Sequence, residues 1–360
     1  MDVIKATAAY ERWLRGETEV VDRDLRYKHA CMDASLFAFF RATFYRWVPL
    51  WQATCGELTK APALLGVGDL HIENFGSWSD SEGRLVWGVN DVDEATTMPY
   101  AVDLVRLATS ALVARREDHL AIAPDDACAA ILEGYVDGLE DGGGAFVLEE
   151  EHPGLRAWAL AADRAPPKFW AKLVAFRTVR APPAVQKMLA ASLPDRRLTF
   201  RTVHRISGLG SLGRPRYVAI ASWAGANVAR EAKPMLRSAY GWALGRSDGR
   251  WRGADLLKTA IRCPDPGIRY VDRWQVRRLA PYCSRIELSS LPKTRDEHRL
   301  LHAMGRETAN LHLGTRQAKA PVLRHLGRQK DSWLERAARA MLKATKADWK
   351  AWRARRRAVS

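Results

Sequence analysis

The stretch GVGDLHIENFGSW, residues 66–78, places an Asp, a His, a Glu and an Asn within six positions. The apolar segment ALLGV (63–67) leads into it and predicts a buried strand. A second acidic cluster, within WGVNDVDEA (87–95), follows a turn-rich segment and an alternating pattern that together predict a β-hairpin. A connecting turn needs Gly, Asn or Asp but not two acidic clusters, so we expect the hairpin to bring the clusters together for a function.

Length and composition are those of an ordinary globular protein. The chain has 360 residues, of which 47% are hydrophobic and 27% charged, so it can build one large domain or two lobes. No apolar run approaches the roughly 18 residues of a transmembrane helix, and the charged N-terminus lacks the pattern of a secretory signal. We therefore expect a cytoplasmic protein in which the five scattered cysteines are reduced thiols.

The net charge of +16 is concentrated near the C-terminus, where residues 324–360 carry more than half of it. Mostly apolar residues recur there at helical spacing and predict an amphipathic helix with a basic outer side. They are Trp333, Ala337, Met341, Thr345, Trp349 and Trp352. Two interpretations stay open: the helix docks on the core with its cations in solvent, or it binds an anionic partner such as nucleic acid, a phosphate-rich substrate or a membrane surface.

Three parts with different secondary structure are expected along the chain. Residues 1–198 are helix-rich and carry the acidic loops, residues 199–292 are strand-rich, and residues 293–360 return to helix. We expect the third part to pack on the first, which gives an α+β protein with two lobes. Apolar spacing predicts helices within 28–55, 100–117 and 124–140, and alternation predicts strands on both sides of residues 208–213.

The acidic loops carry the residue types that phosphoryl transfer needs. Asp69, at the end of a predicted strand, can accept the proton of a hydroxyl nucleophile. The amide of Asn74 and the carboxylate of Asp91 can hold Mg²⁺, a hard cation that takes oxygen ligands and substrate phosphates. Clustered carboxylates raise the free energy of the folded state unless a bound ligand compensates their charge, so a metal–phosphate site is expected here.

A second candidate motif is GLGSLG, residues 208–213, between two predicted strands. Its residues with a possible role in phosphate binding are Gly208, Gly210, Ser211 and Gly213. A Rossmann loop would lead into a helix, whereas a strand–loop–strand arrangement over phosphates is the protein-kinase form. A tight hairpin turn is the structural alternative. Arg230 and Lys233, about twenty residues further on, lie on opposite faces of the next strand, and either could bind phosphate.

Several segments resemble known families. GDLHIEN, VNDVDEA and YAVDLVRLATS look like the catalytic half of aminoglycoside- and choline-kinase-like phosphotransferases. Over roughly residues 30–350 the chain more closely resembles the bacterial family known as domain of unknown function 2252, through segments such as FAFFRATFYRW, GLGSLGRPRYVA, AREAK and GRETANLHLG. The resemblance implies a protein-kinase-like two-lobed fold. It also implies a circular permutation, because the catalytic loop here precedes the Gly-rich loop.

The resemblance also implies roles for single residues. Asp69 resembles the catalytic base, and His71 the residue that orients its loop. Asn74 and Asp91 resemble metal ligands, and Asp93, which replaces a Gly, joins them as a metal candidate.

Around these residues the resemblance implies further positions. Asp103 resembles the buried Asp that braces the catalytic loop, while Val67 replaces a His that often stands before it. The family's phosphate-binding Lys falls at Arg230, so either Arg230 or Lys233 takes that role.

The expected function is an ATP- and Mg²⁺-dependent phosphotransferase that acts on an unidentified hydroxyl acceptor. A catalytically inactive nucleotide-binding pseudokinase, or an anion- or nucleic-acid-binding scaffold, is the alternative. Asp103 and His71 taken alone could be structural groups, and Arg277 and Arg278 are most simply surface cations on a strand. His312, within a predicted helix, is assigned no role.

Overall fold

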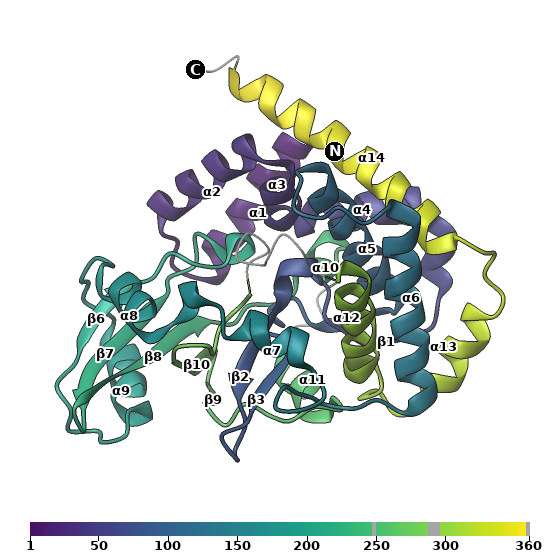
Figure 1. Ribbon diagram of the computed structural model, residues 1–360. Helices are drawn as coiled ribbons and strands as arrows, with labels where there is room; N and C mark the ends of the chain where they lie inside the picture. Colours follow the sequence, from purple (N-terminus) through teal and green to yellow (C-terminus); the bar gives the residue numbers. More distant parts are fainter. Residues whose placement is uncertain (247–249, 287–295, 358–360) are drawn as a thin grey trace.

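The structure is a computed structural model that describes residues 1–246, 250–286 and 296–357 (Figure 1). The predicted boundary between residues 292 and 293 lies outside these ranges. The helices are α1 (Val3–Glu17), α2 (Asp22–Ala34), α3 (Leu36–Ala42), α4 (Phe44–Thr54), α5 (Ala101–Arg116), α6 (Pro124–Asp141), α7 (Pro153–Ala159), α8 (Pro166–Val174), α9 (Pro183–Ser192), α10 (Ala239–Ala243), α11 (Gly253–Thr259), α12 (Glu297–His312), α13 (Lys319–Leu326) and α14 (Trp333–Arg357).

Short 3-10 helices and strands complete the described elements. The 3-10 helices are η1 (Gly56–Lys60), η2 (Ile72–Asn74), η3 (Ala162–Arg164) and η4 (Leu209–Ser211). The strands are β1 (Ala63–Gly66), β2 (Phe75–Ser79), β3 (Leu85–Val89), β4 (Thr96–Pro99), β5 (Phe146–Val147), β6 (Arg201–His204), β7 (Tyr217–Trp223), β8 (Ala226–Pro234), β9 (Ile268–Val271) and β10 (Trp274–Leu279). The α+β prediction is therefore confirmed, as are the helices expected within 28–55, 100–117 and 124–140.

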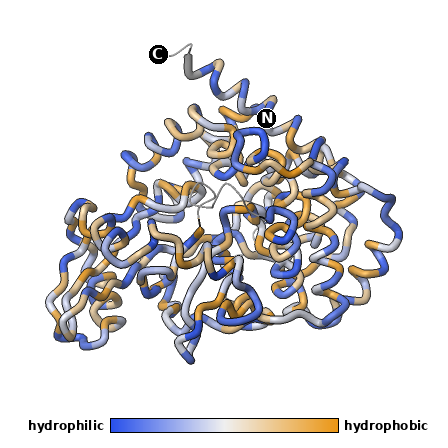
Figure 2. Tube along the Cα trace, in the orientation of Figure 1, coloured by the Kyte–Doolittle hydropathy of each residue, from blue (hydrophilic) through white to orange (hydrophobic). Residues whose placement is uncertain are grey.

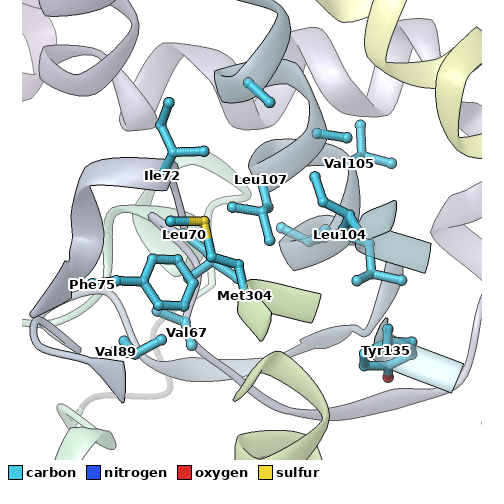
Figure 3. Close-up of a cluster of buried hydrophobic side chains, with 14 of the residues drawn as sticks. Val67, Leu70, Ile72, Phe75, Val89, Leu104, Val105, Leu107, Tyr135 and Met304 are labelled. Atoms are coloured by element: carbon cyan, nitrogen blue, oxygen red, sulfur yellow. The ribbon is translucent and has the colours of Figure 1, made fainter. Parts of the chain in front are cut away.

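The acidic loops lie between two small antiparallel sheets. β1 pairs with β4, and β2 pairs with β3 in the predicted hairpin, which β5 extends. In Figure 3 the apolar loop residues Val67, Leu70 and Ile72 belong to one cluster with side chains of α5, and all three are buried. Since these side chains anchor the loop in the core, the polar residues between them are held in a fixed backbone.

A five-stranded antiparallel sheet forms the other side of the molecule, at the left of Figure 1. Its strand order is β6-β7-β8-β10-β9, and residues 205–216, which contain the Gly-rich segment, join the paired strands β6 and β7. Alternation gives the sheet two apolar faces. Leu173 of α8 packs on the face with Val218 and Ala229, and Leu189 of α9 packs on the face with Ala232.

The C-terminal helices pack on the helical side of the molecule. α12 lies along α6, and α14 lies across α5 and α4. Hydrophilic and hydrophobic residues alternate along α14 in Figure 2, and Met341, Thr345 and Trp352 of the predicted stripe are buried. The indole of Trp349 donates a hydrogen bond of 2.8 Å to the Met32 carbonyl of α2. The apolar side of α14 thus docks on the core, as the first interpretation expected.

Two further predictions concern the whole chain. All five cysteines are free, as expected. Within residues 1–246, 250–286 and 296–357, the structure contains no helix with both the length and the apolar character of a bilayer-spanning segment.

Glycines set the distance between α6 and α12. A Cβ atom added at Gly134 of α6 would lie 1.9 Å from the His302 carbonyl oxygen of α12, and one added at Gly305 would lie 2.1 Å from the Ile131 carbonyl oxygen. Both distances are far below van der Waals contact with rigid backbone. The two helices therefore pack at a separation that only glycine permits.

We expect Gly134→Ala to destabilise the protein by about 1–3 kcal/mol, because a methyl group forces the two helices apart. Thermal and urea unfolding would measure the loss. Gly16→Ala is the matched control: Gly16 also lies in a helix, α1, but a Cβ there meets nothing within 4 Å. That variant should be neutral or slightly stabilised. Equal stability of the two variants would contradict the packing argument.

Candidate functional site

The hairpin brings the two acidic clusters together through Asn74. The Asn74 amide nitrogen donates to the backbone carbonyls of Asp69 at 3.2 Å and Asp91 at 2.9 Å. Its amide oxygen accepts from the Asp91 backbone N–H at 3.0 Å. One amide side chain therefore fixes the spacing of Asp69 and Asp91, which the sequence places on either side of the hairpin.

Asp103 of α5 holds the loop that carries Asp69. Its two carboxylate oxygens accept hydrogen bonds of 2.7 Å from the backbone N–H groups of Val67 and Gly68. The Nε2 atom of His312, on α12, lies 2.9 Å from the same carboxylate, and its Nδ1 atom lies 2.8 Å from the Tyr135 hydroxyl. Asp103 thus sits where the resemblance implied a bracing residue. His312, to which we assigned no role from the sequence, orients it from a distant helix.

Arg106, one helical turn after Asp103, contacts the candidate base directly. Its Nε and Nη2 atoms lie 2.8 and 2.5 Å from Oδ1 of Asp69. Burial raises the pKa of the Asp69 carboxyl, and Arg106 and Arg41 oppose that rise. The sequence prediction missed Arg106, although its i+3 spacing from Asp103 places both on one side of α5.

The Gly-rich loop lies directly over Asp69. A Cβ atom at Gly210 would lie 3.2 Å from Asp69 Oδ2, so only glycine allows this approach without displacement. Ser211 stabilises the loop from within: its hydroxyl donates to the Gly208 carbonyl at 3.1 Å and accepts from Arg216 at 3.0 Å.

Helix α2 and the residue before it form hydrogen bonds to the backbone of the Gly-rich loop. Lys28 Nζ donates to the Gly210 carbonyl at 3.1 Å, and the Val21 N–H donates to the Gly213 carbonyl at 2.8 Å. Gly213 has a φ of 99°, which favours glycine, and a Cβ there would lie 2.5 Å from Leu25. The loop is thus held in a closed position by the N-terminal helices.

Lys233 of β8 is the cation that meets the acidic loops. Its Nζ atom lies 3.2 Å from Asp91 Oδ1 and 2.6 Å from Asp93 Oδ1. Burial disfavours ionisation of Asp91, but Lys233, with Arg216 and Arg277, outweighs it and lowers the pKa of that carboxyl. Burial and the neighbouring Asp91 raise the pKa of Asp93.

Arg230 lies elsewhere. Its guanidinium donates to the backbone carbonyls of Ser192, at the end of α9, and of Ala229. The predicted opposite orientation of Arg230 and Lys233 is therefore confirmed, and Lys233 alone of the two reaches the acidic loops. Lys233 therefore faces the candidate site, and the binding of phosphate by either residue stays a prediction.

A buried carboxylate, Glu231, gathers three arginines beneath the Gly-rich loop. Arg205, Arg216 and Arg277 lie 2.6, 2.9 and 2.8 Å from it. Arg277 also reaches the Asn90 side chain, and its side chain is only 17% exposed. The expectation that Arg277 is a surface cation is therefore wrong. The neighbouring strand β8 carries Glu231, a buried carboxylate whose charge Arg277 helps to compensate.

His71 and Glu94 complete the wall of the site. His71 is buried, and burial together with Arg41 and Arg106 lowers the pKa of its imidazole well below the usual value, so the ring is neutral near pH 7. Glu94 accepts hydrogen bonds from the Ser238 hydroxyl and the Ala239 N–H, and lies 3.5 Å from Arg214. The second acidic loop is thus tied through Glu94 to the segment that follows β8.

Two cavities meet at this place. The smaller, of about 60 Å³, is lined by the predicted residues Asp69, His71, Asn74, Asp91, Asp93, Gly208, Gly210 and Ser211. The larger, of about 400 Å³, is lined by α8, the start of the Gly-rich segment and Leu279 of β10. Both cavities are lined by Arg41, Gly208, Leu209 and Arg285. Most sequence-predicted site residues therefore surround one cavity, while four of them stand outside its lining: Asp103, Gly213, Arg230 and Lys233. Lys233 is joined to the cavity through its contacts with Asp91 and Asp93.

The oxygen atoms of the smaller cavity suit a hard cation. Asp93 Oδ2 is buried without a hydrogen-bond partner, although Arg214 Nη1 lies 3.7 Å from it, and the Asp91 side chain is 41% exposed. Among the residues that the structure describes, no three His, Cys, Asp or Glu side chains form a metal-binding group by themselves. Mg²⁺ commonly takes one or two carboxylates and completes its shell with phosphates and water. Asp91, Asp93 and Asn74 fit that pattern.

Comparisons with known proteins reach the part of the chain that carries the acidic loops. Residues 20–157 match the family model described as an uncharacterized protein conserved in bacteria (DUF2252). The match spans α2 to α6, with Asp69, Asp91 and Arg106, and ends before the Gly-rich loop. Neither the curated proteins nor the solved structures contain a match to the chain.

The contact between Lys28 and the Gly-rich loop predicts a pH-dependent stability. Burial lowers the pKa of Lys28 to about 8, from an ordinary value of 10.5. The folded state therefore binds fewer protons than the unfolded state between these values, and stability rises with pH there by up to about 1.4 kcal/mol per unit. Lys28→Met should remove this rise, as measured by urea unfolding at pH 7 and pH 9.5.

The control is Lys5→Met, since the Lys5 side chain is 73% exposed on α1. This variant should follow the wild type at both pH values. A wild type and a Lys28→Met variant that differ by the same free energy at both pH values would contradict the predicted titration.

Proposed function

We propose that the protein is an ATP- and Mg²⁺-dependent phosphotransferase with a kinase-like, circularly permuted arrangement. One observation carries the proposal: Lys233 Nζ lies 3.2 Å from Asp91, and the Gly-rich loop lies over Asp69 beside them. In protein kinases a Gly-rich loop between two strands covers the phosphates, and the next strand bears a lysine. The order β6, Gly-rich segment, β7 and β8 with Lys233 supports the same arrangement here.

The larger cavity is the proposed nucleoside pocket. Its volume of about 400 Å³ lies in the range of small-molecule sites, and Phe169, Leu173 and Leu279 give it apolar walls. Because Gly208 and Leu209 line both cavities, a nucleoside in the larger one would direct its phosphates toward Asp91. The smaller cavity has a volume of only about 60 Å³, so we expect the Gly-rich loop to move when a nucleotide binds.

The acidic loops and Lys233 have separate proposed tasks. Asp91 and Asp93, with the amide oxygen of Asn74, would hold Mg²⁺, which neutralises charge on the phosphates when bound. Lys233 would bind phosphate oxygens as they approach Asp91. Asp69 would orient the acceptor hydroxyl and take its proton. The neutral His71 would keep the loop in place. The class of the acceptor stays open among small molecules, protein side chains and nucleotides.

A nucleotide-binding protein without turnover is the second candidate. The pairing of Lys233 with both Asp91 and Asp93 favours it, because oxygens that bind a lysine are less available to a metal. Asp93 stands where the resemblance implies a Gly, which also favours a protein without turnover. Binding of nucleic acid by the outer side of α14 is a separate possibility, and it would weaken steeply with salt and survive Asp91→Ala.

A thermal-shift titration separates these candidates. ATP with Mg²⁺ should raise the melting temperature of the wild type more than ATP with EDTA, because the metal links the phosphates to Asp91. Asp69→Asn should keep this shift and lose nucleotide hydrolysis. If the wild type binds ATP but does not hydrolyse it, the result would favour the second candidate. No metal-dependent shift in the wild type would count against the phosphotransferase.

Lys233 and Arg230 offer a matched pair of variants on one strand. Lys233→Met should weaken the effect of MgATP on stability and lower any ATP turnover by at least about tenfold, since a phosphate ligand is lost. Arg230→Met should change neither, because Arg230 lies on the α9 face of the sheet. Radiolabelled phosphate release and thermal shift measure both effects. Equal losses in the two variants would contradict the assignment of Lys233.

A further inference from the structure

Arg106 is a fully buried cation whose one acidic hydrogen-bond partner among the described residues is Asp69. Both of its hydrogen bonds to that carboxylate end on Oδ1, and its Nη2 also donates to the Phe40 carbonyl at 3.0 Å. A charged side chain without access to water is retained only where it is compensated. The position of Arg106 therefore depends on the position of Asp69.

Aromatic rings fix the plane of this guanidinium. Its Cζ atom lies 4.0 Å from the ring centroid of Phe40, 4.9 Å from that of Phe44 and 5.1 Å from that of Trp47. These distances are those of cation–π contacts, which add attraction to steric confinement. The rings come from α3 and α4, so three helices determine where Arg106 points.

The geometry makes the two oxygens of Asp69 unequal. Oδ1 receives both hydrogen bonds from Arg106, whereas Oδ2 faces the Gly-rich loop, 3.2 Å from the position of a Cβ atom at Gly210. The Asp69 side chain is 19% exposed, while Arg106 is not exposed at all. The oxygen turned toward the cavity is thus Oδ2.

We propose that Arg106 is a positioning residue that holds Asp69 with Oδ2 toward the acceptor. The inference rests on the proposed phosphotransferase activity. The acceptor's O–H proton passes to Oδ2 while its oxygen bonds to the γ-phosphorus of ATP. The bond from that phosphorus to the bridging oxygen breaks, and its electron pair leaves with ADP.

Three variants test the inference in the full-length protein, with MgATP as substrate and water as acceptor. Arg106→Met keeps much of the side-chain volume and removes the hydrogen bonds. Arg106→Lys keeps the charge but lacks the planar guanidinium that donates two hydrogen bonds to Oδ1. Arg262→Met is the matched control, because the Arg262 side chain is only 8% exposed, lies 4.0 Å over the Trp78 ring and pairs with Glu307 away from Asp69.

The expected result is a split between kcat and KM. Arg106→Met should lower kcat by about 100-fold, because a misplaced catalytic group costs rate rather than affinity, and leave the KM for ATP within about threefold. Arg106→Lys should fall between Arg106→Met and the wild type. Guanidinium ions at millimolar concentration should partly restore kcat in Arg106→Met, whereas equal sodium chloride should not. Arg262→Met should lose stability with an unchanged kcat.

The outcomes separate this inference from the function on which it rests. An active wild type with unaltered kcat in both Arg106 variants overturns the positioning role alone. A loss in Arg106→Met that matches Arg262→Met, in stability and in kcat, shows a structural role and also overturns it. If Arg106→Met does not fold, a kcat-specific loss in Arg106→Lys supports the role, and an unchanged kcat overturns it. A wild type that releases no phosphate from MgATP overturns the proposed function and this inference together.

Discussion

Compensation of buried charge between Lys233 and the acidic loops is the interaction on which the arrangement of the two sides depends. Asp91 and Asp93 lie close together, and like charges at such a distance repel strongly away from water. Lys233, contributed by the five-stranded sheet, lies within 3.2 Å of both. If the sheet separated from the hairpin, Asp91 and Asp93 would lose this cation, and Lys233 would lose both carboxylates. The same contact defines the candidate site and joins the sheet to the helical side of the molecule.

A second set of interactions keeps the loop of Asp69 rigid. Asp103 takes two backbone N–H groups, and His312 orients Asp103 from α12. The position of α12 in turn depends on its close approach to α6 at Gly134. The backbone geometry near Asp69 thus depends on a helix pair that does not line the smaller cavity. Residues outside a site can pre-organise it in this way.

Local patterns predicted much of this structure. The hairpin, α5, α6 and the docked side of α14 follow from periodicity, and the opposite faces of Arg230 and Lys233 follow from strand parity. What sequence could not supply were partners far apart in the chain. Nothing local shows that Glu231 attracts three arginines. Helices α8 and α9 are a second example. They belong to the part expected to be helical and catalytic, but both pack on the strand-rich part, and nothing in their own sequence shows this.

The attachment of α2 to the Gly-rich loop has a consequence for how the chain folds. Lys28 and Gly210 are 182 positions apart, and Lys233 and Asp91 are 142 apart. Contacts that close such long loops form late, after local helices, since chain entropy must be lost before they add stability. We expect α5, α6 and α12 to gain structure first and the cavity around Asp69 to form last. Until then the acidic loops and the arginines of the sheet face water separately, so the candidate site exists only in the fully folded chain.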